Sequence, residues 1–454
     1  MPRNLAGTDR PIAETVSELM PGLQADLARL VAIPSISSPG YPEPRQPLLD
    51  AYALTVELLR DAGVQNLAAL ELADTAPVIT GEIAAPDGAP TVLLYSHYDV
   101  VAAGDEALWS SPPFVADERG GAIFGRGTAD SKSNIVAHVG ALRAWEGKPP
   151  VGIKVVIEGQ EEVGGGALTT YPPAHPEAFG CDAMVIGDMG SVRPGVPTLT
   201  VALRGMAMAT IEVTTLAGAK HSGQFGGAAP DALIVLLQAL ATLHDANGDV
   251  AVEGLRREAW AGESYTEDEF RELAEVRAGL PLQGTGDLGS RVWSGPAITV
   301  TGIDVPSVDG ALNAVSPHAR AKINLRVHPE QDAAEAQAAL VGHLAALRPF
   351  GIALEVHAGE TGNGFAARTS GPAYEAARAA MEAAWGAAPV SAAGGGSIPL
   401  VNALQAAAPE AEVLLVGTTD GYANIHAPDE RVLLDELAKA IVAEAEFFGR
   451  FAAR

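Results

Sequence analysis

Short apolar runs, each bounded by glycine or polar residues, alternate with stretches of helical periodicity over much of the chain. Four such runs cover residues 91–95, 153–157, 183–186 and 413–416. Short runs rich in β-branched residues and leucine are typical of strands that are buried on both faces of a parallel sheet. Between the first two runs, apolar residues recur at helical spacing over residues 131–145. The pattern therefore predicts an α/β fold with a mostly parallel sheet.

The middle of the chain has a different pattern, in which apolar and polar residues alternate along several segments. Such alternation is typical of half-buried strands in an antiparallel sheet. The predicted strands cover residues 206–214, 297–301, 319–327 and 352–356, and the predicted helices cover residues 231–243 and 332–347. Their order, β-α-β-β-α-β, is that of a ferredoxin-like α+β domain. We expect the charged stretch over residues 252–280 to be helical as well.

Runs of the first type resume after this middle segment, which indicates that the ferredoxin-like domain is inserted into the α/β domain. The predicted boundaries assign residues 1–204 and 365–454 to the two parts of the α/β domain and residues 205–364 to the inserted domain. A chain of 454 residues has the length of two or three domains of ordinary size.

The charge of the chain excludes two broad classes of function. The 29 Lys and Arg residues are outnumbered by 56 Asp and Glu residues, for a net charge of −27. A surface this acidic repels phosphate backbones, and no Lys/Arg cluster suits an anionic membrane, so we expect neither nucleic acid nor a membrane as a partner. The longest apolar run, residues 232–237, is far shorter than the ~20 residues of a membrane helix. Residues 1–10 lack the apolar core of a signal peptide, and the single Cys181 excludes an internal disulfide, so we expect a cytoplasmic protein.

Polar side chains with metal-binding chemistry follow the buried runs or precede the helix between them. They are His97, Asp99, Asp130, Glu161, Glu162, Asp188 and His426. Taken singly, each has an ordinary explanation, such as a helix cap or a solvated loop. However, the carboxyl ends of strands in an open α/β sheet meet at one edge, where ligands bind. Histidine with several carboxylates is a ligand set that divalent metals prefer, so the sequence predicts a metal site at this edge.

Two pairs of residues in this set suggest separate roles for close neighbours. Asp99 can accept a hydrogen bond from the second ring nitrogen of His97, which would fix the tautomer of a metal-binding histidine. Glu161 and Glu162 are adjacent, and neighbours in a turn point in different directions. One carboxylate can therefore bind metal while the other faces a substrate.

Six motifs carry a resemblance to a known family. In chain order they are HYD, GRGTADSK, EGQEE, GD, HSG and NIHAPDE. Together they resemble the dinuclear zinc metallopeptidases that include acetylornithine deacetylase, carboxypeptidase G and carnosinase-type dipeptidases. The segment HSGQFGG at residues 221–227 and the long charged insertion before residue 296 make the dipeptidase branch the most similar.

The resemblance implies two metal sites that share one ligand. His97, Asp130 and Asp188 would bind one ion. His426, Glu162 and Asp130 would bind the other, so that Asp130 bridges the two ions.

The resemblance also implies substrate contacts from the inserted domain, which acts as a lid in this family. His221 would reach the scissile carbonyl, in this family often from the partner subunit, and the sequence leaves open whether it acts in cis or in trans. Asn313 and Arg326 match lid positions that hold substrate, and the loop that contains Gly396 and Ser397 would line the pocket. A homodimer through the lid domain is expected.

The chemistry of the site points the same way. Two divalent ions carry four positive charges, and the three carboxylate ligands carry three negative charges. A bridging hydroxide, with one more negative charge, would neutralise the site. Bound metal lowers the pKa of water toward ~7, and Glu161 is the expected general base that moves the proton to the leaving amine. Zn²⁺ is the expected ion, and Mn²⁺ and Co²⁺ also suit nitrogen and oxygen ligands.

One segment departs from the family pattern. The family commonly has Asp or Met after the bridging Asp and Gly two residues later, whereas Ser131 and Asn134 stand in this segment here. No metal ligand is lost. The difference falls at the start of the predicted helix and at the edge of the pocket, where it bears on the choice of substrate.

The expected function is metal-dependent hydrolysis of the amide bond in a dipeptide or an N-acyl amino acid with a free carboxylate. Two alternatives remain open from the sequence. An aminopeptidase of the related dinuclear class shares the ligand order, but that class normally lacks the lid with His221. A catalytically silent metal-binding relative would keep the site without turnover, although Glu161 and all five expected ligands are present.

Overall fold

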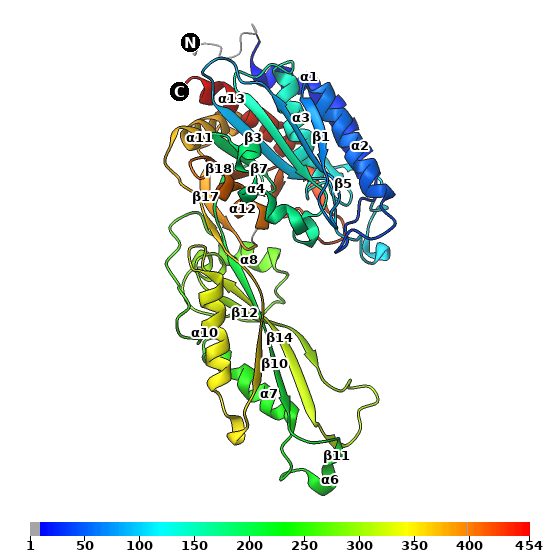
Figure 1. Cartoon of the computed structure of the whole chain (residues 1–454), viewed down its shortest axis with the longest axis vertical. Helices are drawn as coiled ribbons and strands as arrows, with labels where there is room; N and C mark the ends of the chain where they lie inside the picture. Colours follow the sequence, from blue (N-terminus) through cyan, green and yellow to red (C-terminus); the bar gives the residue numbers. More distant parts are fainter. Residues whose placement is uncertain (1–9, 397) are drawn as a thin grey trace. The chain divides into compact units, whose positions relative to one another are not determined.

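The computed structural model describes residues 10–396 and 398–454. These residues divide into two compact units, of which the second is inserted in the first (Figure 1). The first unit comprises the described residues up to Val201, Ala367–Ala392 and Ile398–Arg454. The second comprises Ala202–Ala366 and a short segment that begins at Ala393. The main boundaries lie near the predicted ones, after residues 204 and 364, but the segment at Ala393 groups with the inserted unit.

A mixed β-sheet forms the centre of the first unit, with strand order β1-β2-β6-β3-β7-β18-β9 and with β17 paired to β9. The strands are β1 (Gln65–Leu70), β2 (Val78–Ile83), β3 (Thr91–His97), β6 (Gly152–Glu158), β7 (Ala183–Gly187), β9 (Thr198–Leu203), β17 (Val390–Gly394) and β18 (Glu412–Val416). Pairing is parallel among β6, β3, β7 and β18, and antiparallel for β1–β2, β2–β6 and β18–β9.

The prediction of a mostly parallel sheet is therefore correct only for the centre. The four central strands are the four apolar runs of the sequence, and they are almost wholly buried. The outer strands lack such a run. The residues of β1 are all exposed or half-buried, so its sequence carries little strand signal.

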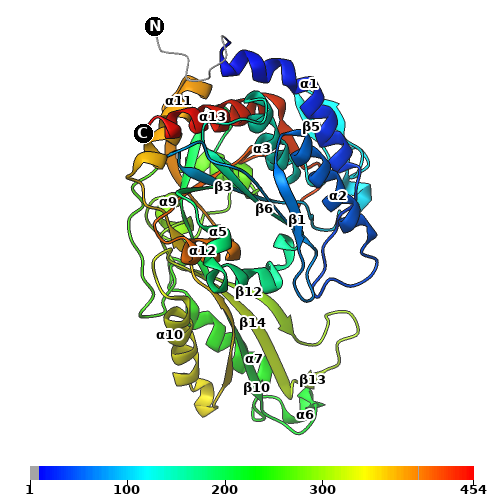
Figure 2. The ribbon, with the colours of Figure 1, turned by 45° about the horizontal axis from the view of Figure 1, so that its top comes forward.

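Helices cover both faces of this sheet. Figure 2 shows α1, α3, α11 and α13 on one side of β3 and β6, and α5 and α12 on the other. The helices of the first unit are α1 (Ile12–Val31), α2 (Gln46–Asp61), α3 (Lys132–Ala144), α4 (Tyr171–Ala174), α5 (Pro176–Phe179), α11 (Pro372–Trp385), α12 (Pro399–Ala407) and α13 (Leu434–Ala452).

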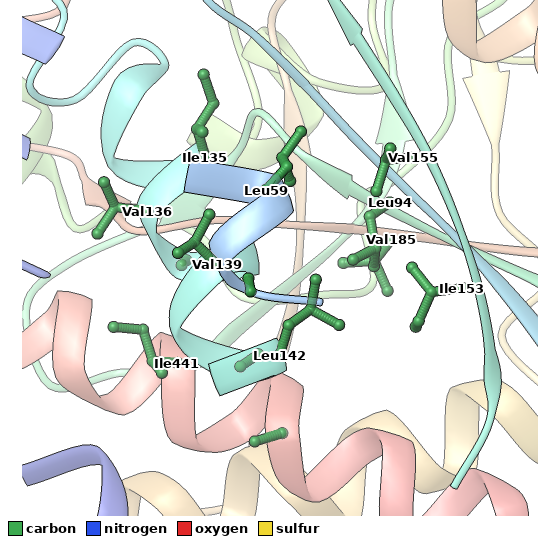
Figure 3. Packing of buried hydrophobic residues seen from close by; sticks show 14 of the residues in the cluster. Leu59, Leu94, Ile135, Val136, Val139, Leu142, Ile153, Val155, Val185 and Ile441 are labelled. Atoms are coloured by element: carbon green, nitrogen blue, oxygen red, sulfur yellow. The ribbon is translucent and has the colours of Figure 1, made fainter. Parts of the chain in front are cut away.

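Helix α3 is buried along nearly its whole length, because it packs against β3 as well as against α1 and α13. Its Ile135 and Val139 lie in one apolar cluster with Leu94 of β3 and Val185 of β7 (Figure 3). Full burial of such a side chain contributes ~1.5–3 kcal/mol. This packing fixes the start of α3, where Asp130 stands, relative to the ends of the central strands.

An antiparallel sheet and two packed helices form the core of the described part of the second unit. The elements are β10 (Gly205–Thr214), α7 (Ala232–Leu240), β12 (Ala297–Asp304), β14 (His318–Val327), α10 (Ala333–Ala346) and β15 (Glu355–Gly362). The strand order is β12-β14-β10-β15, and the chain order is β-α-β-β-α-β, which is the ferredoxin-like arrangement. Alternate residues of β10, from Ala207 to Val213, are buried in a core shared with both helices.

Residues 252–280 are mostly irregular, so the prediction of a helix for this stretch is wrong. Only α8 (Glu267–Leu273) is helical among them, and it begins at a capping box of Thr266 and Glu269. The stretch lacks regularly spaced apolar residues and contains several glycines, which weaken a helix.

Short elements complete the described fold. Small sheets are formed by β4 (Asp117–Arg119), β5 (Ala122–Phe124) and β20 (Arg431–Leu433), by β8 (Gly190–Ser191) and β19 (Thr419–Asp420), and by β11 (Lys220–His221) and β13 (Ala314–Val315). Strand β16 (Phe365–Ala366) pairs with β9, and the remaining helices are α6 (Ser222–Phe225) and α9 (Leu288–Val292). None of the helices in the described ranges has the length and apolar character needed to cross a membrane.

Candidate active site

The ends of the central strands carry two of the predicted metal ligands. Strand β3 ends at His97, and β7 ends at Gly187, directly before Asp188. These strands are parallel neighbours, so the two side chains meet at one edge of the sheet. Asp130 reaches the same place from the loop before α3, as the hydrogen-bond distances show.

Asp130 lies between two groups of ligands, all in the first unit. Its Oδ1 is 2.8 Å from Nε2 of His97, which is 3.2 Å from Oδ1 of Asp188. Its Oδ2 is 3.3 Å from Nε2 of His426, which is 2.9 Å from Oε2 of Glu162. The structure thus brings the five predicted ligands together, with one oxygen of Asp130 facing each group.

The spacing of these atoms fits divalent ions. Two donors that each lie ~2.1 Å from a tetrahedral ion are about 3.4 Å apart, close to the distances between the ligand atoms here. Oε1 of Glu162 is buried and has no hydrogen-bond partner within the described ranges, a need that a cation would satisfy. Ligand atoms within 4.8 Å of one another come from His97, Glu161 and Asp188 in one group and from Asp130, Glu162 and His426 in the other.

Burial and crowding shift several pKa values in this cluster. Burial raises the pKa of Asp188 to about 7. Burial, and then the charge of Asp188, raise the pKa of Glu161 well above its usual range. Hydrogen bonds to Asp130 and Glu162 raise the pKa of His426 to about 10. So many buried acids with so few compensating charges favour the binding of cations.

Asp99 supports both groups of ligands. Its carboxylate accepts hydrogen bonds from the backbone N–H groups of Glu161 and Glu162, each at 3.2 Å. Its Oδ1 and its backbone carbonyl oxygen lie 3.3 Å and 3.1 Å from Nδ1 of His97. The contact with His97 agrees with the prediction. The anchoring of the Glu161–Val163 turn was not predicted.

Glu430 organises the loop that carries Asp130, and the sequence analysis missed it. Its buried carboxylate accepts hydrogen bonds at 2.8–3.0 Å from three backbone N–H groups, those of Gly127, Ala129 and Asp130. It also pairs with the buried Arg126 at 2.6 Å. The partners lie about 300 positions apart in sequence, so only its place in the NIHAPDE motif could have indicated a role.

The loop that carries His426 has a strained backbone. Asn424, His426 and Asp429 have φ angles of 55°, 62° and 57°, in the left-handed region that non-glycine residues avoid. Such residues cost on the order of 1–3 kcal/mol each and cluster at functional sites. The Asp429 carboxylate accepts hydrogen bonds from the backbone and hydroxyl of Ser110, at 2.8 and 2.6 Å, which helps to hold this conformation.

Three predicted substrate contacts lie in the second unit. His221 ends β11, and the N–H of the next residue, Ser222, donates to the carbonyl oxygen of Asn313 at 2.8 Å. His221 and Asn313 are therefore neighbours, and both are exposed. Arg326 lies near the end of β14 and is half-buried. Their role in substrate binding stays a prediction.

Arg204 lies near Arg326 and was not predicted. Its Nε and Nη1 are buried and lack a hydrogen-bond partner in the described part of the chain. Burial, together with the charge of Arg326, lowers the pKa of Arg204 to about 10. The backbone N–H of Arg204 donates to the backbone carbonyl of Gly394 at 3.2 Å, in the predicted pocket loop. In that loop Gly396 is exposed, and Ser397 lies outside the described residues.

In the second unit, Glu258, His328 and Glu330 also bring ligand-type side chains together, but their contacts are explained without a metal. Arg256 pairs with Glu258 at 2.7 Å and with Glu330 at 3.0 Å. The backbone N–H of Glu330 donates to Nδ1 of His328 at 3.2 Å, so the ring proton of the neutral histidine is on Nε2. Glu258 and Glu330 are therefore exposed partners of Arg256, and the buried His328 has a backbone hydrogen bond.

Comparison with known families gives the class of protein. The sequence matches the family described as Peptidase family M20/M25/M40 over residues 93–450. This chain therefore belongs to that family of peptidases. The resemblance inferred from the motifs is confirmed, and the matched region contains every predicted metal ligand.

Individual relatives agree with the dipeptidase branch. The Cysteinylglycine-S-conjugate dipeptidase of Corynebacterium striatum is 42% identical over 381 residues, which cover 82% of this chain and 84% of the relative. The Beta-Ala-His dipeptidase of Rattus norvegicus is 27% identical over 407 residues, 84% of this chain and 82% of the relative. The crystal structure of human carnosine dipeptidase 1 has the same fold, with a TM-score of 0.82 over 98% of each chain at 24% identity.

Proposed function

We propose that this chain is a dinuclear metal-dependent dipeptidase that hydrolyses the amide bond of a dipeptide or a related N-acyl amino acid. The observation that carries the proposal is the position of Asp130, whose two carboxylate oxygens face separate groups of ligands. Membership of the peptidase family and the dipeptidase names of the relatives support it.

The residues present fit two divalent ions. His97, Asp130 and Asp188 would hold one ion, and His426, Glu162 and Asp130 would hold the other. The ions would supply a water molecule of lowered pKa and would polarise the substrate carbonyl. We propose Zn²⁺, with Mn²⁺ and Co²⁺ as alternatives that accept the same nitrogen and oxygen ligands.

Glu161 is the proposed general base. Its carboxylate would take the proton of the attacking water and give it to the leaving amine. Burial and the charge of Asp188 raise its pKa, which suits a group that both accepts and returns a proton. The Asp99 carboxylate accepts a hydrogen bond from the backbone N–H of Glu161 at 3.2 Å. This bond fixes the turn from which the Glu161 carboxylate projects.

Residues of the second unit would bind the rest of the substrate. His221 would stabilise the negative charge that develops on the carbonyl oxygen. Arg326 would pair with the terminal carboxylate, because a guanidinium group can hold a carboxylate through two parallel hydrogen bonds. Asn313, Gly396 and Ser397 would complete the substrate contacts.

We also propose a homodimer formed through the second unit. Strand β12 is at the edge of its sheet, and its residues from Thr299 to Asp304 are all exposed. They include the apolar Val300 and Ile303. An edge strand with exposed apolar residues favours pairing with a second copy. A cytoplasmic location is proposed because the single Cys181 provides no internal disulfide.

The test is a substrate panel measured before and after removal of metal. The panel contains Cys-Gly S-conjugates, β-Ala-His, other dipeptides and N-acyl amino acids, each with its C-terminal amide as the matched control. We expect hydrolysis that stops with a strong chelator, returns with Zn²⁺ or Mn²⁺, and favours the free carboxylate. Equal turnover of the amides would favour the aminopeptidase alternative. Bound ions without turnover of any substrate would favour a silent relative.

A further inference from the structure

A buried set of hydrogen-bonded side chains lies in the first unit. We call Ser96, Ser131, Asn134 and Thr418 the hydroxyl–amide cluster, and each is at most 2% exposed. Nδ2 of Asn134 donates to Oγ of Ser131 at 3.0 Å. Oδ1 of Asn134 accepts from the backbone N–H and the hydroxyl of Thr418 at 3.0 and 3.2 Å. The hydroxyl oxygens of Ser96 and Ser131 are 2.7 Å apart.

The Ser131 hydroxyl is the centre of the cluster. It donates to the backbone carbonyl of Gly187 at 3.0 Å. A serine hydroxyl has one proton and two lone pairs, so Ser131 gives its proton to Gly187 and accepts from Asn134 and Ser96. Its hydrogen-bonding capacity is therefore fully used, and its contacts link β3, α3 and the end of β7.

An ordinary helix cap does not explain Ser131. The residue occupies the N-cap position of α3, where a serine side chain usually accepts a hydrogen bond from a backbone N–H group in the first turn of the helix. The Ser131 side chain makes no such bond. Its hydroxyl connects the start of the helix to two strands instead.

The links of the cluster end beside proposed metal ligands. Ser96, Ser131 and Gly187 are the chain neighbours of His97, Asp130 and Asp188, respectively. These three ligands come from separate elements, and their relative positions decide whether their donor atoms can meet at one ion. Hydrogen bonds beyond the ligands themselves commonly orient a metal site in this way.

Two glycines, Gly187 and Gly417, border the side chain of Asn134. A Cβ atom on Gly187 would lie 3.2 Å from Cβ of Asn134. A Cβ atom on Gly417 would lie 2.9 Å from Oδ1 of Asn134 and 1.8 Å from the carbonyl oxygen of Met189. The side chain of Asn134 therefore packs closely against the backbone at Gly187 and Gly417.

We propose that Ser131 and Asn134 are positioning residues, which hold the backbone segments of His97, Asp130 and Asp188 at a set separation before an ion binds. This inference rests on the proposed metal site. It assigns a function to Ser131, which stands where the family commonly has Asp or Met, and to Asn134, which lies three residues further along.

The test compares metal affinity in Ser131→Ala and in Ser133→Ala. Ser133 is a matched control, because it lies in the first turn of α3 and is equally buried. Its hydroxyl contacts the Thr418 end of the cluster at 2.6 Å rather than Ser96, Ser131 or Gly187, which adjoin the proposed ligands. Affinity is measured by competition with a chromophoric chelator, and ligand geometry by the visible spectrum of the Co²⁺ form. Steady-state kinetics then separate kcat from KM.

For Ser131→Ala we expect a ~10–100-fold loss of affinity for at least one ion, a changed Co²⁺ spectrum and a lower kcat with little change in KM. Ser133→Ala should match the wild type in affinity and spectrum, even if both variants lose similar thermal stability. If Ser131→Ala does not fold, Asn134→Ala, which leaves the Ser131–Gly187 bond in place, should show a loss in the same direction. Wild-type affinity and spectrum in the folded variant would overturn the inference. A wild-type protein that binds no divalent ion would instead refute the proposed metal site.

Discussion

Glu161 and Glu162 share one backbone anchor but have different side-chain partners. Oε2 of Glu162 is 2.9 Å from His426, whereas the carboxylate of Glu161 lies with His97 and Asp188. We predict that Glu162→Gln lowers metal occupancy at the His426 site. Glu161→Gln should keep both ions and lower kcat by at least ~10²–10⁴-fold, the usual contribution of general acid–base catalysis, with little change in KM.

Metal content and kcat, measured side by side for the two variants, check this assignment, and each variant serves as the control for the other. If Glu161→Gln loses an ion while Glu162→Gln keeps both, the two roles are exchanged. If Glu161→Gln remains fully active, the proposed proton transfer is wrong.

Glu158 is a buried acid that the proposed mechanism does not use. The hydroxyl of Tyr95 donates to its Oε1 at 2.8 Å, and its Oε2 has no hydrogen-bond partner within the described ranges. Burial raises the pKa of Glu158 to about 8, against 4.5 for an ordinary glutamate. Between these values the folded chain keeps a proton that the unfolded chain has lost.

The contribution of Glu158 to the free energy of unfolding should therefore fall as pH rises from 4.5 to about 8, by ~1.4 kcal/mol for each pKa unit at most. Glu158→Gln removes this contribution while keeping the shape of the side chain. Urea unfolding of the metal-free protein at pH 5 and pH 8 checks it. We predict that the stability of the wild type relative to the variant falls between these values. An unchanged difference would show that Glu158 has an ordinary pKa in the folded chain.

Among the secondary-structure elements, β12 is an edge strand of the sheet in the second unit that carries exposed apolar side chains. Its outer edge is free, and Val300 and Ile303 are 37% and 41% exposed. We predict that Val300→Lys combined with Ile303→Lys turns a dimer into a monomer, because two charges on an edge strand oppose pairing with a second copy. Analytical ultracentrifugation measures the change.

Val308→Lys is the matched control, since Val308 is 92% exposed and lies outside the strand. It should leave the dimer intact. A double variant that remains dimeric would place the interface elsewhere, and dissociation by the control would show a general effect of added charge.

The sequence predicted elements best where burial is complete. The central strands β3, β6, β7 and β18 are buried, so nearly every position is apolar and the signal is strong. Strand β1 is exposed or half-buried along its length, and its pairing with β2 depends on contacts that a local pattern cannot carry. The antiparallel edges of the sheet were missed for this reason.

The site was predicted from motifs, and its supporting contacts were not. His97, Asp130 and His426 stand in recognisable motifs. The hydrogen bond from the Ser131 hydroxyl to the carbonyl of Gly187 joins residues 56 apart, and that from the N–H of Asp130 to the Glu430 carboxylate joins residues 300 apart. The motifs that contain Ser131 and Glu430 do not indicate which residues these side chains bind, so these hydrogen bonds are found only in the folded chain.

At the scale of the whole molecule, the proposed ions would join distant parts of the chain. The ligands run from His97 to His426, on both sides of the inserted unit in sequence, yet all belong to the first unit. Ions that bind only the folded state stabilise it by mass action, by ~2.7 kcal/mol at a concentration 100 times the Kd. Loss of the shared ligand, Asp130, should therefore weaken the binding of both ions, whereas loss of His426 should weaken the binding of one.

The decisive measurement for the sharing of Asp130 by two ions is the number of divalent ions per chain, obtained by inductively coupled plasma mass spectrometry. The samples are the wild type, His426→Ala and Asp130→Ala, each purified in the same way and shown to be folded by circular dichroism. We predict two ions in the wild type, one in His426→Ala, and neither retained in Asp130→Ala. A wild-type protein with fewer than two ions, or an Asp130→Ala variant that keeps both, would contradict it.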